Sequence, residues 1–460
     1  MERSAGILLP IFSLPSKHGI GCFSMEAIKF IDFLANAKQR YWQILPLVIP
    51  GACESPYQSV STFAGNPLFI DLDQLVISRL LTKEEVESYD WDNTSNKIDY
   101  GKVKQYKTEL IYKAFQRSDH YKKPWFVSFC NRNEYWLDDY AYFMEDKEGK
   151  PCDYYRFEQF LFEQQWFAVK SYANYKGIQI IGDLPIYVSL DSADVYYDPE
   201  LFQLECRCVP KAVAGCAPDY SSEDGQIWGN PLYDWDYNKQ TNYTWWKKRM
   251  KHCLSLHDIV RIDHFRGFYD YFSIPYGDNN ARNGEWKLGP GMDLFNELEK
   301  SLGKMNVIVE DLGFLSPGAY NFVQESGYPG MKILQFAFNG GKDNPYLPEN
   351  ISENFVVYTG THDNNTTHGW YESATDWEKE HLNQYIPNIT DIGWDLAELA
   401  MSTRANMCII QLQDYLSLGA DCRINTPGTC FGNWQWKLNE IPTNEISTRI
   451  RQLTEKYNRI

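Results

Sequence analysis

The chain has 460 residues, 43% of them hydrophobic, and a formal net charge of −17. This hydrophobic content supports a large packed core and excludes a disordered chain. The acidic balance disfavours nucleic acid and anionic membranes as partners, because both attract basic patches. We therefore expect a globular protein whose substrate is neutral, with no nucleic-acid or membrane partner.

Short apolar runs recur along the chain, each bounded by polar or turn residues. In chain order they are Gly6–Leu9, Trp42–Leu45, Ile178–Ile181, Ile259–Ile262, Val307–Val309, Ile333–Phe336, Phe355–Tyr358 and Cys408–Leu412. Continuous apolar runs are typical of parallel strands that are buried on both faces. Eight such runs over this length predict an α/β fold, a (β/α)₈ barrel of the TIM type.

Two long stretches depart from the strand–helix rhythm. Residues 51–177 are rich in Tyr, Phe and Trp and have helical patterning, whereas residues 190–256 contain many turn residues. We expect one catalytic barrel over residues 1–460. The helical stretch 51–177 and the loop-rich stretch 190–256 would then form subdomains around the active-site cleft, over the carboxyl-terminal face of the barrel.

Acidic residues follow five of the apolar runs. They are Asp183, Asp263, Glu310, Asp363 and Asp414. In a (β/α)₈ barrel the carboxyl ends of the strands converge on the active site. The sequence therefore predicts several carboxylates around one cleft.

Three of these acids suit the cleavage of a glycosidic bond with retention. That chemistry needs an ionised carboxylate that attacks the sugar and a protonated carboxyl that donates to the leaving oxygen. Asp263 is our nucleophile, because Arg261 lies on the same side of the strand and would keep it ionised. Glu310 follows an apolar run that favours its protonated form, so it is our general acid/base. Asp363 would stabilise the oxocarbenium-like transition state. Each acid taken alone also fits a structural ion pair, a cap or a turn.

Several motifs occur together along nearly the whole chain. They are Ser55-Pro56-Tyr57, Phe63–Pro67, Gly182–Val188, Ile227–Tyr233, Arg261–Phe268, Glu310–Gly313, Met331–Phe338, Gly360–Asp363, Asn425–Thr429 and Gly432-Asn433-Trp434. With these motifs the chain resembles the amylomaltase family, also called 4-α-glucanotransferases or disproportionating enzymes. The resemblance implies the same three catalytic roles and transfer of an α-1,4-glucan segment, held on Asp263, to the 4-hydroxyl of an acceptor glucose or maltooligosaccharide. It implies no metal and no organic cofactor. It also implies sugar binding by Tyr57, Asp183, Trp228, Arg261, His264, His362 and Asp414.

Alternatives remain open at this point. A predominantly hydrolytic α-1,4-glucan hydrolase would use the same acids, whereas a non-catalytic glucan-binding protein would be expected to lack one of them. Ala217 and Ser221 replace a Pro and a Phe that the family usually carries in a loop over the active site. We expect this loop to admit more water, which predicts a larger share of hydrolysis than in a typical relative. Chain-length preference, cyclic glucan formation, oligomeric state and physiological pathway are not determined by the sequence.

The 11 cysteines include no C-x-x-C pair and no zinc-site spacing. We expect free thiols in a reducing compartment.

The apolar segment Ala5–Pro10 is too short for a signal peptide, and no run of about 18 apolar residues is present. These features predict a cytoplasmic protein. Cys206 and Cys208 receive no role.

Overall fold

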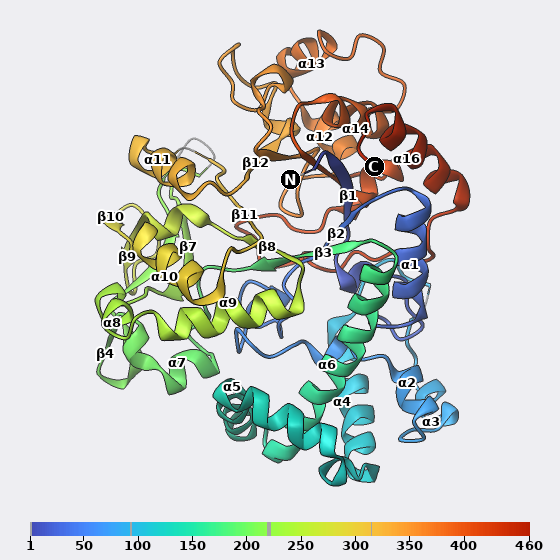
Figure 1. Ribbon diagram of the computed structural model, residues 1–460, viewed down its shortest axis with the longest axis vertical. Coiled ribbons are helices and arrows are strands. Elements are labelled where there is room, and N and C mark those ends of the chain that lie inside the picture. The colour runs from blue at the N-terminus through green and yellow to red at the C-terminus, as the bar shows by residue number, and fades with distance from the viewer. Residues whose placement is uncertain (1, 93, 219–221, 314) are drawn as a thin grey trace.

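The computed structural model describes residues 2–92, 94–218, 222–313 and 315–460. Its main sheet has eight parallel strands in the order β11-β8-β3-β2-β1-β14-β13-β12 (Figure 1). Their bounds are β1 Ser4–Leu8, β2 Tyr41–Gln43, β3 Gln179–Leu184, β8 Ile259–Ile262, β11 Val307–Val309, β12 Gly330–Ile333, β13 Phe355–Tyr358 and β14 Met407–Gln411. The two end strands approach each other, because the Val309 N–H donates to the carbonyl of Pro329 at 2.9 Å. The sheet is thus a nearly closed barrel, and the predicted fold class is confirmed.

All eight predicted runs overlap a barrel strand, but one is displaced. The run predicted at Ile333–Phe336 begins at the last residue of β12, and Leu334–Phe336 form a 3₁₀-helix. The charged residue Lys332 interrupts the apolar pattern of the true strand. Its side chain is nevertheless largely buried, with Nζ 4.4 Å from the centre of the Phe355 ring.

Amphipathic helices cover the barrel, and α1 shows why they form. The hydroxyl of Ser24 accepts the N–H of Glu26 and caps the start of this helix, Met25–Asn36. Its buried residues recur at helical spacing and face the core. The other covering helices are α6 Cys152–Tyr175, α9 Thr244–Leu256, α10 Met292–Leu302, α11 Pro317–Ser326, α14 Ile392–Ser402 and α16 Asn444–Lys456.

Further helices lie outside this ring. Between β2 and β3 the chain forms α2 Leu72–Ile77, α3 Lys83–Glu87, α4 Tyr100–Arg117 and α5 Pro124–Glu148, and α4 and α5 extend below the barrel in Figure 1. Later in the chain lie α7 Ala193–Tyr197, α8 Trp235–Gln240, α12 Thr367–Ser373, α13 Asp376–Asn383 and α15 Leu412–Tyr415. Short 3₁₀-helices comprise Ile11–Ser13, Ala52–Glu54, Pro67–Phe69, His120–Lys122, Pro199–Leu201, Cys206–Cys208, Phe265–Phe268, Leu334–Phe336, Pro348–Asn350 and Ala420–Cys422.

A second, antiparallel sheet lies beside the barrel (Figure 1). Its order is β10-β9-β6-β7, with β6 Ala212–Cys216, β7 Gln226–Pro231, β9 Asp270–Pro275 and β10 Glu285–Leu288. Two of these strands come from residues 190–256, whereas β9 and β10 follow β8. The sheet therefore combines strands from both sides of β8, and the predicted subdomain boundary at residue 256 stays a prediction. A separate hairpin, β4 Leu204–Glu205 and β5 Val209–Pro210, turns at Cys206–Cys208.

The cysteine prediction requires a correction. Cys53 and Cys430 form a disulfide, whereas nine other cysteines are free. The expectation of free thiols is wrong for this pair, because the two residues lie 377 positions apart and are brought together by the fold.

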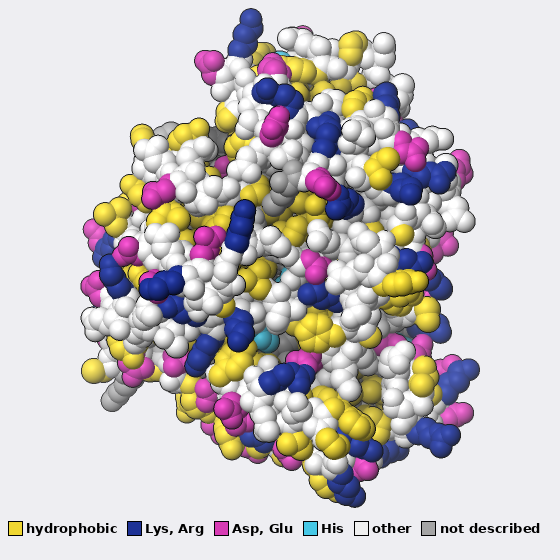
Figure 2. Space-filling model, viewed as in Figure 1, with side chains coloured by type: hydrophobic (Ala, Val, Ile, Leu, Met, Phe, Trp, Pro, Cys, Tyr) yellow, Lys and Arg dark blue, Asp and Glu magenta, His cyan; other side chains and the backbone are white. Residues whose placement is uncertain are grey.

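On the face seen in Figure 2, basic and acidic side chains are interspersed. Among the described residues, no helix combines the length and apolarity needed to cross a membrane.

Candidate active site

The three predicted catalytic acids line one cleft of about 970 Å³. Asp263 directly follows β8, Glu310 directly follows β11, and Asp363 lies in the loop after β13. Hydrogen bonds between neighbouring strands continue to the first two acids. The Asp263 N–H donates to the carbonyl of Leu184, and the Glu310 N–H to that of Ile262, both at 3.0 Å. The barrel thus fixes the backbones that carry these side chains.

Arg261 lies at the centre of the acidic cluster. Its Nη1 donates to both carboxylate oxygens of Asp183, at 2.7 and 2.6 Å, and lies 3.1 Å from Oδ1 of Asp263. Its Nη2 donates to Oε2 of Glu310 at 2.7 Å. The guanidinium is buried, as is the carboxylate of Asp183. The single cation Arg261 therefore offsets the repulsion among Asp183, Asp263 and Glu310 and holds the three carboxylates in a fixed arrangement.

Asp263 and Glu310 are in side-chain hydrogen-bond contact. Burial, followed by the charge of Glu310, raises the pKa of Asp263. Burial opposes the ionisation of Glu310. The charge of Arg261 and the hydrogen bonds that the Glu310 carboxylate accepts nevertheless bring the pKa of Glu310 below the usual range. The two carboxyls therefore titrate as a coupled pair. Glu310 accepts the two short hydrogen bonds, from Nη2 of Arg261 at 2.7 Å and from the His264 N–H at 2.9 Å.

A strained backbone supplies one of those donors. His264 has a φ of 47°, in the left-handed region, and its N–H donates to Oε2 of Glu310 at 2.9 Å. A non-glycine residue in this region is uncommon and is concentrated at functional sites. The strain here directs a backbone donor at the acid/base candidate.

Asp363 is held by contacts with Asn425, Arg423 and His362. Its Oδ1 accepts the side-chain amide of Asn425 at 2.6 Å and lies 3.3 Å from Nε2 of His362. Arg423 donates to its backbone carbonyl at 2.6 Å. The Tyr57 hydroxyl lies 2.8 Å from the same His362 nitrogen. The third acid therefore belongs to a connected polar network that fixes its position.

The predicted sugar-binding residues fall into two groups. Tyr57, Trp228 and His264 line the cleft, and the Trp228 and His264 rings meet edge to face at 5.0 Å. Aromatic surfaces of this kind pack against the C–H faces of sugars. Asp183 and His362, like Arg261, are buried. The Tyr57 hydroxyl bonds Asp183 at 2.8 Å, so this second group supports the cleft from beneath.

Asp414 does not reach the cleft. Its side chain is fully buried and accepts the hydroxyls of Thr359 and Thr367 at 2.6 and 2.8 Å, and the N–H of Thr367 at 2.7 Å. These bonds tie α15 to the loop after β13. Asp414 thus lies in α15, which begins immediately after β14, and its carboxylate is held by these partners. The sugar contact implied by the resemblance stays a prediction.

Other residues line the cleft without having been assigned a role from the sequence. They include Gln58, Tyr187, Ile227, Asn230, Asn425 and Trp434. The Gln58 amide donates to the carbonyl of Trp228 at 2.9 Å and to Asn230 at 3.0 Å, joining two walls. All of these residues except Gln58 lie in motifs that carried the resemblance, so membership of those motifs was the available signal.

The loop that carries Ala217 is only partly described. Ala217 packs beside the apolar cluster formed by Val213, Phe272, Ile274 and Ala281. Ser221 lies outside the described residues, so the predicted increase in hydrolysis stays a prediction. Among the described residues, no group of three or more His, Cys, Asp or Glu side chains is placed to hold a metal ion.

The fold and the cleft together define a class of enzyme. A parallel barrel that presents a contacting carboxyl pair and a third carboxylate at its strand ends has the arrangement of enzymes that cleave glycosidic bonds with retention.

Comparison with known proteins identifies the family. The family model described as 4-alpha-glucanotransferase matches residues 9–152 and 144–443. A 4-alpha-glucanotransferase of Clostridium butyricum is 42% identical over 483 residues, covering 98% of this chain and 99% of its own. That of Thermus thermophilus is 39% identical over 504 residues, covering both chains completely. An amylomaltase from Streptococcus agalactiae, solved with acarbose, superimposes with a TM-score of 0.95 at 35% identity over both whole chains. The chain belongs to the 4-α-glucanotransferase family.

Proposed function

We propose that Asp263 and Glu310 carry out a double displacement that moves a segment of an α-1,4-glucan to the 4-hydroxyl of an acceptor glucose or maltooligosaccharide. The observation that carries this proposal is the contact between the two carboxyls beside Arg261. An inverting mechanism needs room for a water molecule between its carboxyls, at a separation of roughly 6.5–9.5 Å. A pair in contact instead suits direct attack by one carboxylate.

In the first step Asp263 attacks the anomeric carbon of the donor glucan while Glu310 gives a proton to the departing glycosidic oxygen. This step needs Asp263 ionised and Glu310 protonated. The two side chains interact directly, so one proton can be shared within the pair. Arg261, 3.1 Å from Asp263, pairs with the ionised nucleophile.

In the second step the acceptor glucan occupies the place of the leaving group. Glu310, now ionised, takes the proton from the acceptor 4-hydroxyl. At the same time the oxygen of that hydroxyl displaces Asp263 from the sugar. The product again has the α configuration, because two inversions at one carbon restore the original one. Water in place of the acceptor would give hydrolysis.

The remaining groups of the cleft bind and orient the glucan. Asp363 would accept hydroxyls of the donor ring and offset the positive charge of the transition state. Tyr57, Trp228 and His264 would contact the sugar, and Arg261, Asp183 and His362 would hold these groups in place. We also propose that the protein acts in the cytoplasm, where the nine free cysteines remain reduced.

Incubation with maltotriose followed by chromatography tests the function. Transfer gives glucose together with a ladder of shorter and longer maltooligosaccharides, whereas pure hydrolysis gives only shorter products. Asp263→Asn and Glu310→Gln should each abolish the ladder while circular dichroism shows an unchanged fold. An undiminished ladder in either folded variant would remove that residue from the mechanism.

A further inference from the structure

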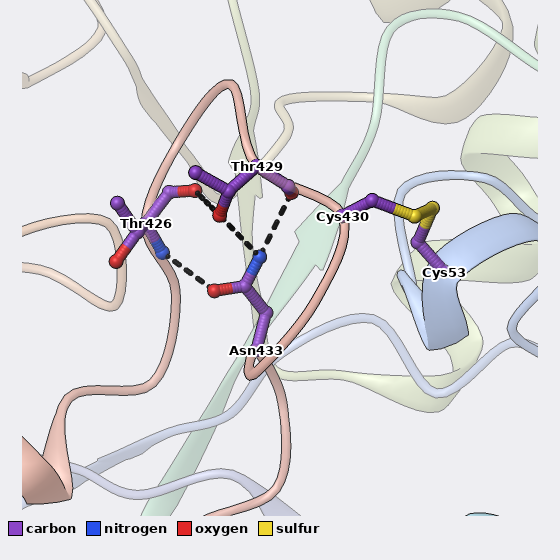
Figure 3. The surroundings of a disulfide bond; sticks show 5 residues. All are labelled: Cys53, Thr426, Thr429, Cys430 and Asn433. Atoms are coloured by element: carbon purple, nitrogen blue, oxygen red, sulfur yellow. Dashed lines mark hydrogen bonds between the residues drawn. A yellow bond between two sulfur atoms is a disulfide. The ribbon is translucent and has the colours of Figure 1, made fainter.

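The disulfide between Cys53 and Cys430 joins two segments of the chain (Figure 3). Both cysteines line the same cleft as the three acids, and both are exposed to solvent. Neither residue contributes to the chemistry proposed above. The bond therefore acts on the wall of the site.

One of the two loops, residues 425–434, leads directly to the third acid. At its base Asn425 donates to Asp363, and the Asn425 N–H donates to the carbonyl of His362 at 3.0 Å. Within the loop, the Asn433 side chain accepts the N–H of Thr426 at 2.9 Å and donates to the carbonyl of Thr429 at 2.9 Å (Figure 3). The loop is thus a closed turn, and its outer edge carries Cys430.

The second loop, residues 51–57, ends at Tyr57. Cys53 and Glu54 both adopt left-handed φ values, 58° and 57°. Two successive non-glycine residues in this region are unfavourable, so the surroundings must hold them there. The disulfide holds Cys53, and Lys104 of α4 pairs with Glu54 at 3.0 Å. Loss of the disulfide would remove one of these two restraints.

We propose that the Cys53–Cys430 disulfide is a reducible clamp that holds the outer wall of the cleft in its glucan-binding position. This inference rests on the proposed function and adds control of glucan affinity to it. A cytoplasmic location makes such a bond reversible, because disulfides that form in the cytosol are usually transient or redox-sensing. Exposed disulfides are also the ones most readily reduced.

Opening of the clamp is a thiol–disulfide exchange. A thiolate of a small dithiol attacks one cysteine sulfur, the S–S bond breaks, and the other cysteine leaves as a thiolate that takes up a proton. The second thiol of the reagent then attacks the mixed disulfide, which releases the first cysteine and leaves the reagent as a cyclic disulfide. Two electrons pass to the protein. A low-molecular-weight disulfide reverses the reaction and closes the clamp.

The clamp should affect binding more than catalysis. It joins the loops at their outer parts, whereas the bonds from Asn425 to Asp363 and from Tyr57 to Asp183 do not depend on it. With the disulfide intact, the two loops are preorganised for binding. After reduction of the disulfide the loops must be ordered when glucan binds, and this ordering weakens the affinity. We expect reduction to raise KM for maltotriose about threefold to tenfold and to change kcat by less than about twofold.

The test compares enzyme treated with dithiothreitol and enzyme treated with oxidised glutathione. Thiol titration after denaturation should give nine free thiols in the oxidised form, against 11 cysteines in the sequence. Cys53→Ser/Cys430→Ser should show the KM of the reduced enzyme under both treatments. Cys206→Ser/Cys208→Ser, which removes two exposed free thiols, should keep the full redox response.

A second readout separates failure of the clamp from failure of the proposed function. Calorimetry with maltoheptaose on folded Asp263→Asn should show the same threefold to tenfold weakening upon reduction, without any need for turnover. Eleven thiols after oxidation, or equal KM and Kd in the two redox forms, would overturn the clamp. If neither redox form of the unsubstituted enzyme transferred glucan, the proposed function would fail, and the Kd comparison would still decide the clamp.

Discussion

The side-chain amide of Asn425 donates to Oδ1 of Asp363 at 2.6 Å, across 62 positions of sequence. This bond holds Asp363 through a residue of the loop 425–434, which lies outside the barrel strands. Both residues line the substrate cleft. The orientation of a catalytic group thus depends on the loop 425–434 as well as on the barrel.

Asn425→Ala should lower kcat by about tenfold to a hundredfold, because a hydrogen bond to a charged group is worth roughly 1.5–3 kcal/mol. Steady-state kinetics with maltotriose would measure the effect. Asn439→Ala, at an exposed position, is the matched control and should leave kcat unchanged. An equal kcat in the two variants would show that Asp363 does not need this donor.

Arg261→Lys should lower kcat at least about tenfold and shift the acid limb of kcat/KM to higher pH. Lysine cannot reproduce the planar fork that contacts Asp183, Asp263 and Glu310. The charge of Arg261 lowers the pKa of Glu310, so weaker contact raises that pKa, and the pair takes up its second, inactivating proton at higher pH. A pH–rate profile from pH 3 to 9 would measure the shift.

The control for this variant is Arg282→Lys, which alters an exposed arginine paired with Asp224. Its acid limb should coincide with that of the unsubstituted enzyme. An unmoved limb in Arg261→Lys would mean that the arginine does not govern the protonation of the carboxyl pair.

The sequence was sufficient to predict the barrel because its strands are buried on both faces and read as unbroken apolar runs. β8 and β13 coincide with predicted runs, whereas Lys332 concealed the start of β12. Asp263 and Glu310 were visible for the same reason, since each directly follows a buried strand, whereas Asp183 lies within β3 and is itself buried. Asp414 shows the limit of this logic: it follows a strand, but α15 turns it into the protein interior.

Long-range pairings could not be predicted in the same way. No local pattern indicates that Cys53 meets Cys430, because their approach depends on two loops from opposite ends of the chain. The burial of Asp183 and His362 beneath the cleft likewise depends on Tyr57, which lies in another loop. The second sheet was missed as a unit because its strands lie on both sides of β8.

Glu158 should make the free energy of unfolding depend on pH. Burial raises the pKa of this carboxyl to about 8, and the Tyr154 hydroxyl donates to it. The folded state therefore keeps a proton that the unfolded state loses above the ordinary glutamate pKa of 4.5. Stability from this group is full below pH 4.5 and declines as pH rises toward 8.

Glu158→Gln should remove that decline and raise Tm at pH 8 by roughly 2–5 °C. Differential scanning calorimetry between pH 5 and 8.5 would measure it, with the exposed substitution Asp146→Asn as control. A pH dependence of Tm as steep as in the unsubstituted protein would show that Glu158 does not retain its proton in the folded state.

The role of Asp263 can be tested by trapping its sugar ester. Glu310→Gln is incubated with α-maltosyl fluoride, whose leaving group needs no proton from the protein, and the digested protein is analysed by mass spectrometry. We predict one maltosyl unit on the peptide that contains Asp263, and none when Asp263→Asn is added to the same variant. A sugar attached to another residue, or turnover of the fluoride to a product of inverted configuration, would contradict the double displacement.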